Sequence, residues 1–420
     1  MRENPQIIAD SSQFRYAWPD MNPVVTNPEA IEAFLTRGVE RVFPSADFLR
    51  ARLAEGKPLT MYFGIDPTGP ALHLGHAINL RKLRAWQDLG HKVVMLIGDF
   101  TAMIGDPTDK AAARKALSRE EVLANAKSYK EQAGKILRFD GENPVEIRYN
   151  SEWLAKMTFA DVVGLASHFT VQQMLERDMF EKRLEEGKPI HMHEFLYPLM
   201  QGHDSVALKT DGEIGGNDQS FNMLAGRDLM KAVLGKEKFV VAMKLLTDPT
   251  GKKMGKSEGN MITLGDSAED MYGKVMSWPD GMIMSGFEIL TDLSSAELRV
   301  VSRGLSSETL NPRDAKDQLA RLIVASFHGQ AAATAAAEGF VKLFQKHETP
   351  EDMPELKLSG PTKVVDALVA SGAVASKSDA RRQMEQGGVK VDGDTVTDVE
   401  AEVMPGSILQ KGKRHFVKLV

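Results

Sequence analysis

Residues 59–97 carry the pattern that most limits the folds open to this chain of 420 residues. The stretch 59–65, LTMYFGI, is short and apolar and predicts a buried strand, and the run Val93–Ile97 predicts a second one. Between them, a loop rich in glycine and proline leads into a helical pattern over 72–89 that Gly90 ends. A strand, a helix and a strand within about 40 residues predict a right-handed βαβ unit. The predicted fold class is α/β, with a doubly wound, Rossmann-like parallel sheet.

The chain beyond this unit continues the α/β pattern to about residue 250. A capping box, Ser118-Arg119-Glu120-Glu121, begins a helix whose apolar face extends to Leu137. The stretch Val145–Tyr149 predicts a third strand, and residues 158–188 have a helical pattern with many charges. The first 250 residues are therefore expected to form one α/β domain, with an N-terminal extension to about residue 30.

The pattern changes again toward the C-terminus. Residues after Asp266 are helical and rich in alanine, and a linker rich in proline and acidic residues follows them. In the last 60 residues, two short helices at 363–371 and 377–386 precede a hairpin around Asp392-Gly393 and a final strand pair. The expected parts are an α/β domain at 1–250, a glycine-lysine loop at 251–265, a helical domain at 266–348, a linker at 349–361 and a small α+β domain at 362–420.

Charge and cysteine content exclude several classes of protein. The formal net charge is −6, so nothing global indicates nucleic-acid binding, and any basic surface must be local. Because the chain contains no cysteine, disulfides and thiolate metal sites are excluded. The N-terminal sequence has no signal-peptide pattern, and no apolar run approaches the roughly 18 residues of a membrane span. A cytoplasmic protein with no membrane association is expected.

The sequence GIDPTGPALHLGH, residues 64–76, places two histidines three residues apart after the first strand. A metal site is one interpretation, because positions i and i+3 share a helix face, but no third ligand is evident nearby. Two buried structural histidines are a second interpretation. Phosphate binding is the third, because this turn of a doubly wound fold meets nucleotides and a helix N-terminus favours anions. The position of His73, Gly75 and His76 favours phosphate and argues against a metal site.

Three further motifs each have a functional and a plain interpretation. Residues 251–260, GKKMGKSEGN, are either a solvated basic loop or a mobile arm that carries ammonium groups to a polyphosphate. Residues 98–110 follow the second strand and form either an ordinary turn or part of the ligand side of the sheet. Residues 213–220 contain two glycines and are either a plain turn or a close approach to a ribose whose hydroxyl groups donate to Asp218.

Together these motifs resemble the signatures of class I aminoacyl-tRNA synthetases. His73-Leu74-Gly75-His76 is similar to the HIGH signature, and Lys253-Met254-Gly255-Lys256-Ser257 is similar to the KMSKS signature. Four further segments resemble motifs of the bacterial type of tyrosyl-tRNA synthetase. They are YFGIDPT at 62–68, IGDP at 104–107, YPLMQGHD at 197–204 and GGNDQ at 215–219. The last 60 residues resemble the S4 RNA-binding domain that ends these enzymes. The resemblance extends over nearly the whole chain, from about residue 30.

The resemblance implies an activity and its ligands. Such an enzyme is a ligase that activates L-tyrosine with ATP to tyrosyl-adenylate and transfers the tyrosyl group to the 3′ end of tRNA(Tyr) in translation. It uses ATP with Mg²⁺ as a substrate, has no tightly bound cofactor and acts as a homodimer. The helical segment 266–348 would bind the anticodon arm, and the S4-like segment 362–420 would bind RNA.

The resemblance also implies a role for each matching residue. For tyrosine these are Tyr62 and Asp204 at the phenol hydroxyl, Asp106, Tyr197 and Gln201 at the α-ammonium group, and Thr101 and Gln219 nearby. For ATP they are Asp66, Gly75, Gly216, Asp218, Lys256 and Ser257. At the reacting phosphates they are His73, His76, Lys253 and Lys256, with Thr68, Thr101 and Lys110 as helpers. For RNA, the basic residues expected are Lys377, Arg381, Arg382, Lys411, Lys413 and Arg414, although each alone also fits a solvated surface.

Three positions depart from the family pattern. Gly255 replaces the serine within KMSKS, a change frequent in tyrosyl enzymes, whereas His203 replaces a tyrosine and Glu213 a glutamine. Rival functions fit less well. A nucleotidyltransferase with the HxGH loop would not need the lysine loop or the RNA-binding tail, and Tyr62 with Asp204 suits a phenol better than tryptophan. An inactive RNA-binding protein would not need intact histidines and lysines.

Overall fold

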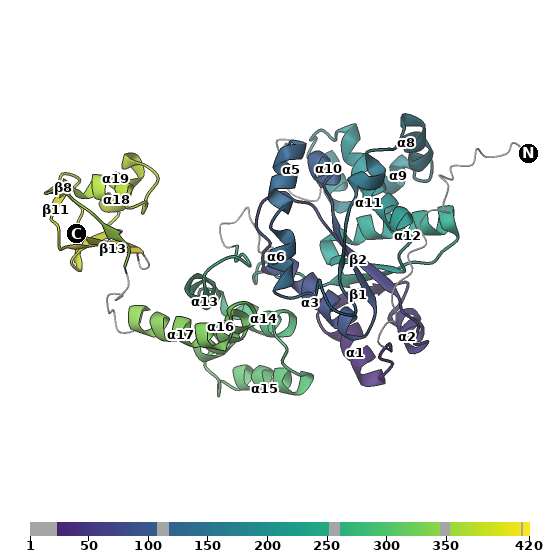
Figure 1. Cartoon of the computed structure of the whole chain (residues 1–420), viewed down its shortest axis with the longest axis horizontal. Coiled ribbons are helices and arrows are strands. Elements are labelled where there is room, and N and C mark those ends of the chain that lie inside the picture. The colour runs from purple at the N-terminus through teal and green to yellow at the C-terminus, as the bar shows by residue number, and fades with distance from the viewer. Residues whose placement is uncertain (1–22, 107–116, 252–260, 345–352, 413–414) are drawn as a thin grey trace, which may run out of the picture. The chain divides into compact units, whose positions relative to one another are not determined.

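The computed structural model of the chain describes residues 23–106, 117–251, 261–344, 353–412 and 415–420. The chain forms two compact units. The first contains Met1–Ser267 and Lys274–Phe327, and the second contains Ala268–Gly273 and His328–Val420. Figure 1 labels many of their helices and strands.

A six-stranded sheet forms the centre of the first unit. Its order is β1-β6-β5-β2-β3-β4, and only the edge strand β1 is antiparallel to its neighbour. The strands are β1 Val39–Phe43, β2 Thr60–Ile65, β3 Lys92–Ile97, β4 Glu146–Tyr149, β5 Gly212–Gly216 and β6 Phe239–Met243. The chain extends from β2 through β3 and β4 on one side and through β5 and β6 on the other. The predicted doubly wound sheet is therefore confirmed, with its switch point between β2 and β5, where such folds bind ligands.

The βαβ unit predicted at 59–97 is present. It consists of β2, α3 (Leu74–Asp88) and β3, and the two strands pair in parallel with Tyr62 opposite Val94. The face of α3 that packs into the protein is mostly apolar, and its Leu83 and Trp86 are fully buried, although Lys82 and Gln87 are buried there too. Burial of this face fixes α3 against the core and so fixes the loop between β2 and α3 at the carboxyl edge of the sheet.

Two predicted helices are divided in the structure. The pattern from Ser118 gives α5 (Arg119–Ala126) and α6 (Tyr129–Gly134), and 158–188 gives α8 (Phe159–Ala166), α9 (Val171–Leu175) and α10 (Asp178–Glu185). At the first break, Asn125, Ser128 and Tyr129 donate hydrogen bonds to carbonyl groups of the loop 67–70. At the second, the Thr170 side chain accepts the Gln173 N–H and begins a new helix.

Residues after Asp266 are helical, as predicted. They form α13 Ala268–Met276, α14 Ile283–Leu290, α15 Ser295–Ser306, α16 Pro312–His328 and α17 Gln330–Phe344. Within the first unit, Arg37 joins the chain near α1 to this segment by donating to carbonyl groups of Glu288, Thr291 and Leu293. The other helices of the first unit are α1 Pro28–Thr36, α2 Ala46–Ala54, α4 Thr101–Ile104, α7 Ser151–Leu154, α11 Met192–Leu208 and α12 Ser220–Leu234.

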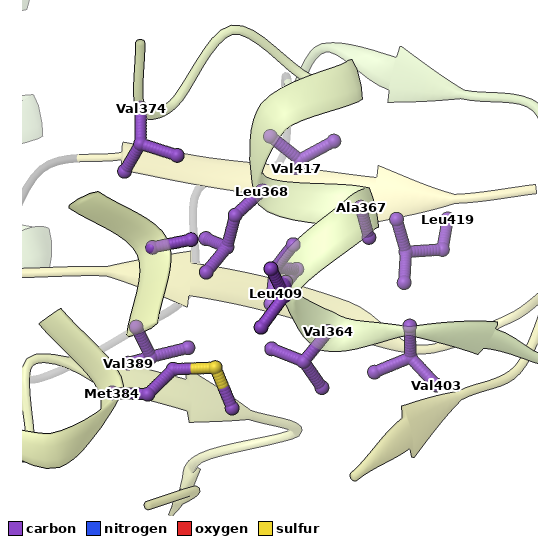
Figure 2. Packing of buried hydrophobic residues seen from close by; sticks show 12 residues of the cluster. Val364, Ala367, Leu368, Val374, Met384, Val389, Val403, Leu409, Val417 and Leu419 are labelled. Carbon is purple, nitrogen blue, oxygen red and sulfur yellow. The ribbon is translucent and has the colours of Figure 1, made fainter. Parts of the chain in front are cut away.

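The C-terminal residues fold into the small α+β domain that was expected. Its sheet has the order β10-β9-β12-β13-β7, and β8 pairs with β11. The elements are β7 Glu355–Leu356, β8 Thr362–Lys363, α18 Val364–Ala370, α19 Lys377–Glu385, β9 Val389–Val391, β10 Asp394–Thr395, β11 Glu402–Val403, β12 Ile408–Lys411 and β13 His415–Leu419. Figure 2 shows Leu368 of α18 and Met384 of α19 packed with Leu409 of the sheet. The predicted hairpin turns at Asp392-Gly393, where both residues have positive φ, as a two-residue turn of this kind requires.

Candidate active site

A cavity of about 710 Å³ opens at the carboxyl edge of the sheet beside β2 and β5. It brings together the candidate residues that the structure describes in the first unit: Tyr62, Asp66, Thr68, His73, Gly75, His76, Thr101, Asp106, Tyr197, Gln201, Asp204, Gly216, Asp218 and Gln219. The candidates Lys110, Lys253, Lys256 and Ser257 lie outside the described residues. Gly251 and Met261, which flank the lysine loop, also line the cavity.

The two histidines form the N-terminal cap of α3. The backbone N–H of Gly75 donates to His73 Nδ1, and the backbone N–H of His73 donates to His76 Nδ1, each at 3.1 Å. The two rings lie against each other, with centroids 3.9 Å apart. Because each Nδ1 accepts a backbone hydrogen, the proton of each neutral imidazole is on Nε2. Both side chains are only partly buried and line the cavity, so they can supply N–H donors at a helix N-terminus.

The deep part of the cavity contains Tyr62 and Asp204, both buried. The Tyr62 hydroxyl lies 2.8 Å from Ser205 Oγ. Asp204 accepts hydrogen bonds from Trp153 Nε1 at 2.7 Å and from Asn150 Nδ2 at 3.3 Å. Burial raises the pKa of Asp204 well above its ordinary value, and the two donors oppose that rise. Burial, together with the nearby Glu213 and Asp204, also raises the pKa of Tyr62, so the phenol keeps its proton at neutral pH.

Carboxylates line the middle of the cavity. Asp66, at the end of β2, accepts hydrogen bonds from Thr101 Oγ1 at 2.7 Å and from the Tyr197 hydroxyl at 2.9 Å. A Cβ atom at Gly98 would lie 1.9 Å from Asp66 Oδ1, so the Asp66–Thr101 contact depends on a glycine there. Asp106 accepts from Gln219 Nε2 at 2.7 Å and pairs with the buried Arg177 at 3.0 Å.

Comparison with known proteins decides the family. Residues 54–345 match the family of class I tRNA synthetases (W and Y), and residues 345–419 match the SYY-like C-terminal domain of tyrosine–tRNA ligase. A tyrosine–tRNA ligase of Moorella thermoacetica is 48% identical over 92% of this chain and 94% of its own length. One of Thermotoga maritima is 47% identical over 93% of this chain and 98% of its own length. The chain belongs to the tyrosine–tRNA ligase family.

Solved structures of tyrosyl-tRNA synthetases share the fold. A C-terminally truncated mitochondrial enzyme of Aspergillus nidulans superposes with a TM-score of 0.63 at 24% identity, over 75% of this chain and 94% of that one. The enzyme of Archaeoglobus fulgidus complexed with L-tyrosine gives 0.58 at 22% identity, over 74% of this chain and 100% of that one.

The structure shows where two of the three departures from the pattern of tyrosine–tRNA ligases lie, those at His203 and Glu213, whereas Gly255 lies outside the described residues. Among the described residues that line the cavity, His203 is absent, and the carboxylate near it is Asp161 of α8. Burial lowers the pKa of His203, and Asp161 opposes this change. Glu213 does line the cavity, but its carboxylate contacts Lys238 and accepts from Gln201 Nε2 at 3.0 Å. The substitution at 213 is therefore part of a buried polar cluster, and the one at 203 lies away from the cavity.

Several residues of the site were not predicted from the sequence. They are Tyr129, Asn150, Trp153, Arg177, Ser205 and Lys238, of which Tyr129 holds the histidine loop by donating to the Gly69 carbonyl at 2.6 Å. The sequence does contain one sign of the contact between Glu213 and Lys238. Glu213 and Lys238 are opposite charges within or beside the apolar strands β5 and β6, and charges in such strands are seldom buried unless they are paired.

The candidate RNA-binding residues lie in the C-terminal domain. On α19, Arg381 and Arg382 are exposed, and Arg382 pairs with Asp379. Lys377 is also exposed, and its Nζ lies 2.7 Å from Asp366 Oδ1. Lys411 is half-buried and donates to the Ala373 carbonyl at 2.8 Å. Lys413 and Arg414 lie outside the described residues.

Two features are absent from the described part of the chain. It contains no cluster of three or more histidine, aspartate or glutamate side chains arranged to hold a metal ion. None of its helices combines the length and the apolar character that crossing a membrane requires.

Proposed function

We propose that the cavity binds tyrosine with its phenol between Tyr62 and Asp204, and ATP with its phosphates at the N-terminus of α3. The overall reaction follows from the family: the chain activates L-tyrosine with ATP and transfers the tyrosyl group to tRNA. One observation carries the assignment of the two ends. A buried carboxylate and a buried phenol lie in the deep part of the same cavity whose partly exposed part holds two Nε2–H donors.

The first step needs positioning and charge stabilisation, and it needs no general base. The tyrosine carboxylate is already ionised; it attacks the α-phosphorus of ATP, an α–β phosphoanhydride bond breaks, and pyrophosphate leaves. His73 and His76 would donate to the phosphate oxygens on which charge develops, and Lys253 and Lys256 would do the same. Mg²⁺ would arrive bound to ATP and neutralise the leaving phosphates, which requires few protein ligands. In the second step the terminal ribose hydroxyl of tRNA attacks the adenylate carbonyl, and AMP leaves.

The same proposal assigns the remaining candidate residues. Asp106, Tyr197 and Gln201, with Thr101 and Gln219, would surround the α-ammonium group of tyrosine. Asp66, Gly75, Gly216 and Asp218 would border the ribose and adenine, with Ser257 contacting ATP and Thr68 and Lys110 assisting at the phosphates. The proposed compartment is the cytoplasm, where translation consumes charged tRNA.

ATP–pyrophosphate exchange, measured with each amino acid in turn, tests this function. Exchange is expected with tyrosine and not with tryptophan or phenylalanine. Exchange with tryptophan alone would favour a tryptophan-specific synthetase, and no exchange with any amino acid would favour an RNA-binding protein without activity. Either result would overturn the proposal.

We further propose that the chain works as a homodimer through the helices that follow β4. Large apolar side chains are exposed on consecutive helices here, on α8, α9, α10 and the start of α11: Phe159, Val163, Val171, Leu184 and Met192. Apolar exposure concentrated in one segment is typical of an interaction surface.

Phe159→Asp is expected to convert the dimer to monomer, because it would place a charge in an apolar contact. Sedimentation velocity measures the change. Val300→Asp, on α15, is a matched control, since Val300 is an apolar side chain of similar exposure outside this segment. A wild-type monomer, or a dimer that Phe159→Asp leaves intact, would contradict the proposal.

The C-terminal segment 362–420 is proposed to bind the RNA backbone, and the helical segment 266–348 the anticodon arm. Reversing both charges in Arg381→Glu/Arg382→Glu is expected to lower kcat/KM for tRNA about tenfold and to weaken its salt dependence, because phosphate contacts are lost. Tyrosine-dependent pyrophosphate exchange should stay normal. Lys57→Glu is the control, since Lys57 is exposed in the first unit. An equal loss in exchange and in charging would argue against an RNA-binding role.

A further inference from the structure

A buried polar cluster lies behind the wall of the cavity. Lys238 Nζ contacts Glu213 and donates to Ser205 Oγ at 2.8 Å, and Ser205 Oγ in turn lies 2.8 Å from the Tyr62 hydroxyl. Lys238, Ser205 and Tyr62 are fully inaccessible to solvent, and Glu213 is 2% exposed. Tyr62 and Glu213 line the cavity, whereas Ser205 and Lys238 lie behind it.

The cluster is built into the packing of the fold. Ser205 comes from α11, Glu213 from β5 and Gly226 from α12, and Lys238 directly precedes β6. A Cβ atom at Gly226 would lie 2.6 Å from Ser205 Oγ and 2.7 Å from Lys238 Nζ, so the contact between these two groups requires a glycine on α12. A buried ion pair contributes little more to stability than apolar side chains of the same volume. Its place beside two candidate tyrosine ligands therefore points to a role in the site.

The chemistry of lysine determines which groups donate and which accept in the contacts from Lys238 through Ser205 to Tyr62. An ammonium group has hydrogens to donate and no lone pair, so Ser205 Oγ must accept from Lys238. A hydroxyl that accepts from a cation becomes a stronger donor and a poorer acceptor. Ser205 is therefore expected to donate its hydrogen to the Tyr62 oxygen. The hydrogen of the Tyr62 hydroxyl is then left for an acceptor on the cavity side, where Glu213, which is also hydrogen-bonded to Tyr62, competes with an oxygen of the substrate.

The carboxylate of Glu213 determines which group donates in its contact with Gln201. Ionised Glu213 accepts only, and it accepts from Gln201 Nε2 at 3.0 Å. Gln201 must turn its NH₂ group toward Glu213, which places its Oε1 on the opposite side of the amide. Gln201 also lines the cavity, so this oxygen is available there as an acceptor.

We propose that the Lys238–Glu213 pair is a positioning device that sets the hydrogen-bond direction of the tyrosine pocket. Through Ser205 it makes Tyr62 a donor to the phenol oxygen of the substrate, whose own hydrogen Asp204 accepts. Through Gln201 it presents an acceptor to the α-ammonium group. The inference rests on the proposed function, because it assumes that tyrosine occupies this cavity.

A double-mutant cycle between Ser205 and Tyr62 tests the first branch. Ser205→Ala removes the link to Lys238 and leaves the charges in place. It is expected to lower the ratio of kcat/KM for tyrosine over phenylalanine about tenfold, measured by pyrophosphate exchange. Ser205→Thr, which retains a hydroxyl group, should restore most of the ratio. In a Tyr62→Phe background, Ser205→Ala should have no further effect, because the group that it orients is gone.

A second variant tests the pair itself. Lys238→Met/Glu213→Gln removes both charges at nearly constant volume, and it should lower the same ratio and raise KM for tyrosine with little change in kcat. Lys82→Met is the control, because Lys82 is another buried lysine, donating to the Phe34 and Arg37 carbonyls away from the cavity. It should lower thermal stability and leave the ratio unchanged.

Wild-type exchange is measured first, because absence of tyrosine-dependent exchange would mean that the proposed function fails. With a normal wild type, an unchanged ratio in Ser205→Ala would overturn the inference alone. Equal effects of Ser205→Ala in both backgrounds would also overturn it, because they would show a structural role. The cycle gives this answer even where the Lys238→Met/Glu213→Gln protein does not fold.

Discussion

Replacing Asp204 with alanine is expected to reduce the preference for tyrosine over phenylalanine by about 10- to 150-fold. In the proposed complex, Asp204 accepts the hydrogen of the substrate phenol in a buried site. Phenylalanine cannot supply that hydrogen, so the wild-type enzyme must desolvate the carboxylate without compensation when phenylalanine binds. Alanine removes this penalty for phenylalanine and removes a hydrogen bond for tyrosine. The values of kcat/KM for the two amino acids therefore become more alike. The measurement is kcat/KM in pyrophosphate exchange with each amino acid.

Two controls separate recognition from folding in this variant. In Asp204→Ala, Trp153 loses its acceptor and Asn150 keeps only Thr101, so the free energy of unfolding should fall by roughly 1–3 kcal/mol, which thermal unfolding would detect. Asp204→Asn keeps the size of the side chain and an acceptor oxygen, and should retain more of the preference. A folded alanine variant that discriminates against phenylalanine as well as the wild type would remove Asp204 from the phenol site.

Replacing His76 with alanine is expected to lower kcat for activation by about 10²–10³, with tyrosine affinity nearly unchanged. The structure gives the reason, because His76 Nδ1 is occupied by the His73 backbone N–H and its donor is therefore Nε2–H. A donor aimed at phosphate oxygens stabilises charge that develops only as pyrophosphate leaves. Single-turnover formation of tyrosyl-adenylate measures the chemical step, and calorimetry with tyrosine alone measures binding.

The matched variant for this prediction is His76→Gln. Its amide can accept from the His73 backbone and donate with its NH₂ group, so it should recover part of the lost rate. A large loss of tyrosine binding in His76→Ala would place the side chain at the amino acid and not at ATP.

The sequence predicts three strands of the six-stranded sheet, β2, β3 and β4, and covers β5 and β6 only by a general α/β pattern. The strands β2 and β3 lie where apolar runs predict them, because a buried parallel strand needs apolar side chains on both faces. The strand β4, EIRY, also lies where it was predicted, although it is an edge strand that is only partly buried. No strand was predicted at β1, whose sequence, VERVF, carries two charges and lies at an antiparallel edge. The divided helix at α5 and α6 depends on hydrogen bonds to the loop 67–70, which lies far away in the chain.

For the candidate site, too, the sequence predicts some residues and misses others. Motifs identified the residues that line the cavity, since each lies in a short contiguous pattern. Their partners Asn150, Ser205 and Lys238 come from elements distant in sequence, and no short motif contains them. Arg177 likewise meets Asp106 only through the fold. Which residue a side chain touches across the sheet is set by tertiary packing, so the sequence alone does not reveal it.

The cap at the start of α3 has a consequence for the order of events in folding and binding. His73 and His76 are held by backbone groups within four residues of each other, so the turn of chain that starts the helix also aims the two imidazoles. These donors are already in place before any ligand arrives, and ATP would not have to spend binding energy on ordering them. The N-terminus of α3 thus presents two aimed donors to this end of the cavity, and backbone groups of its own first turn hold them.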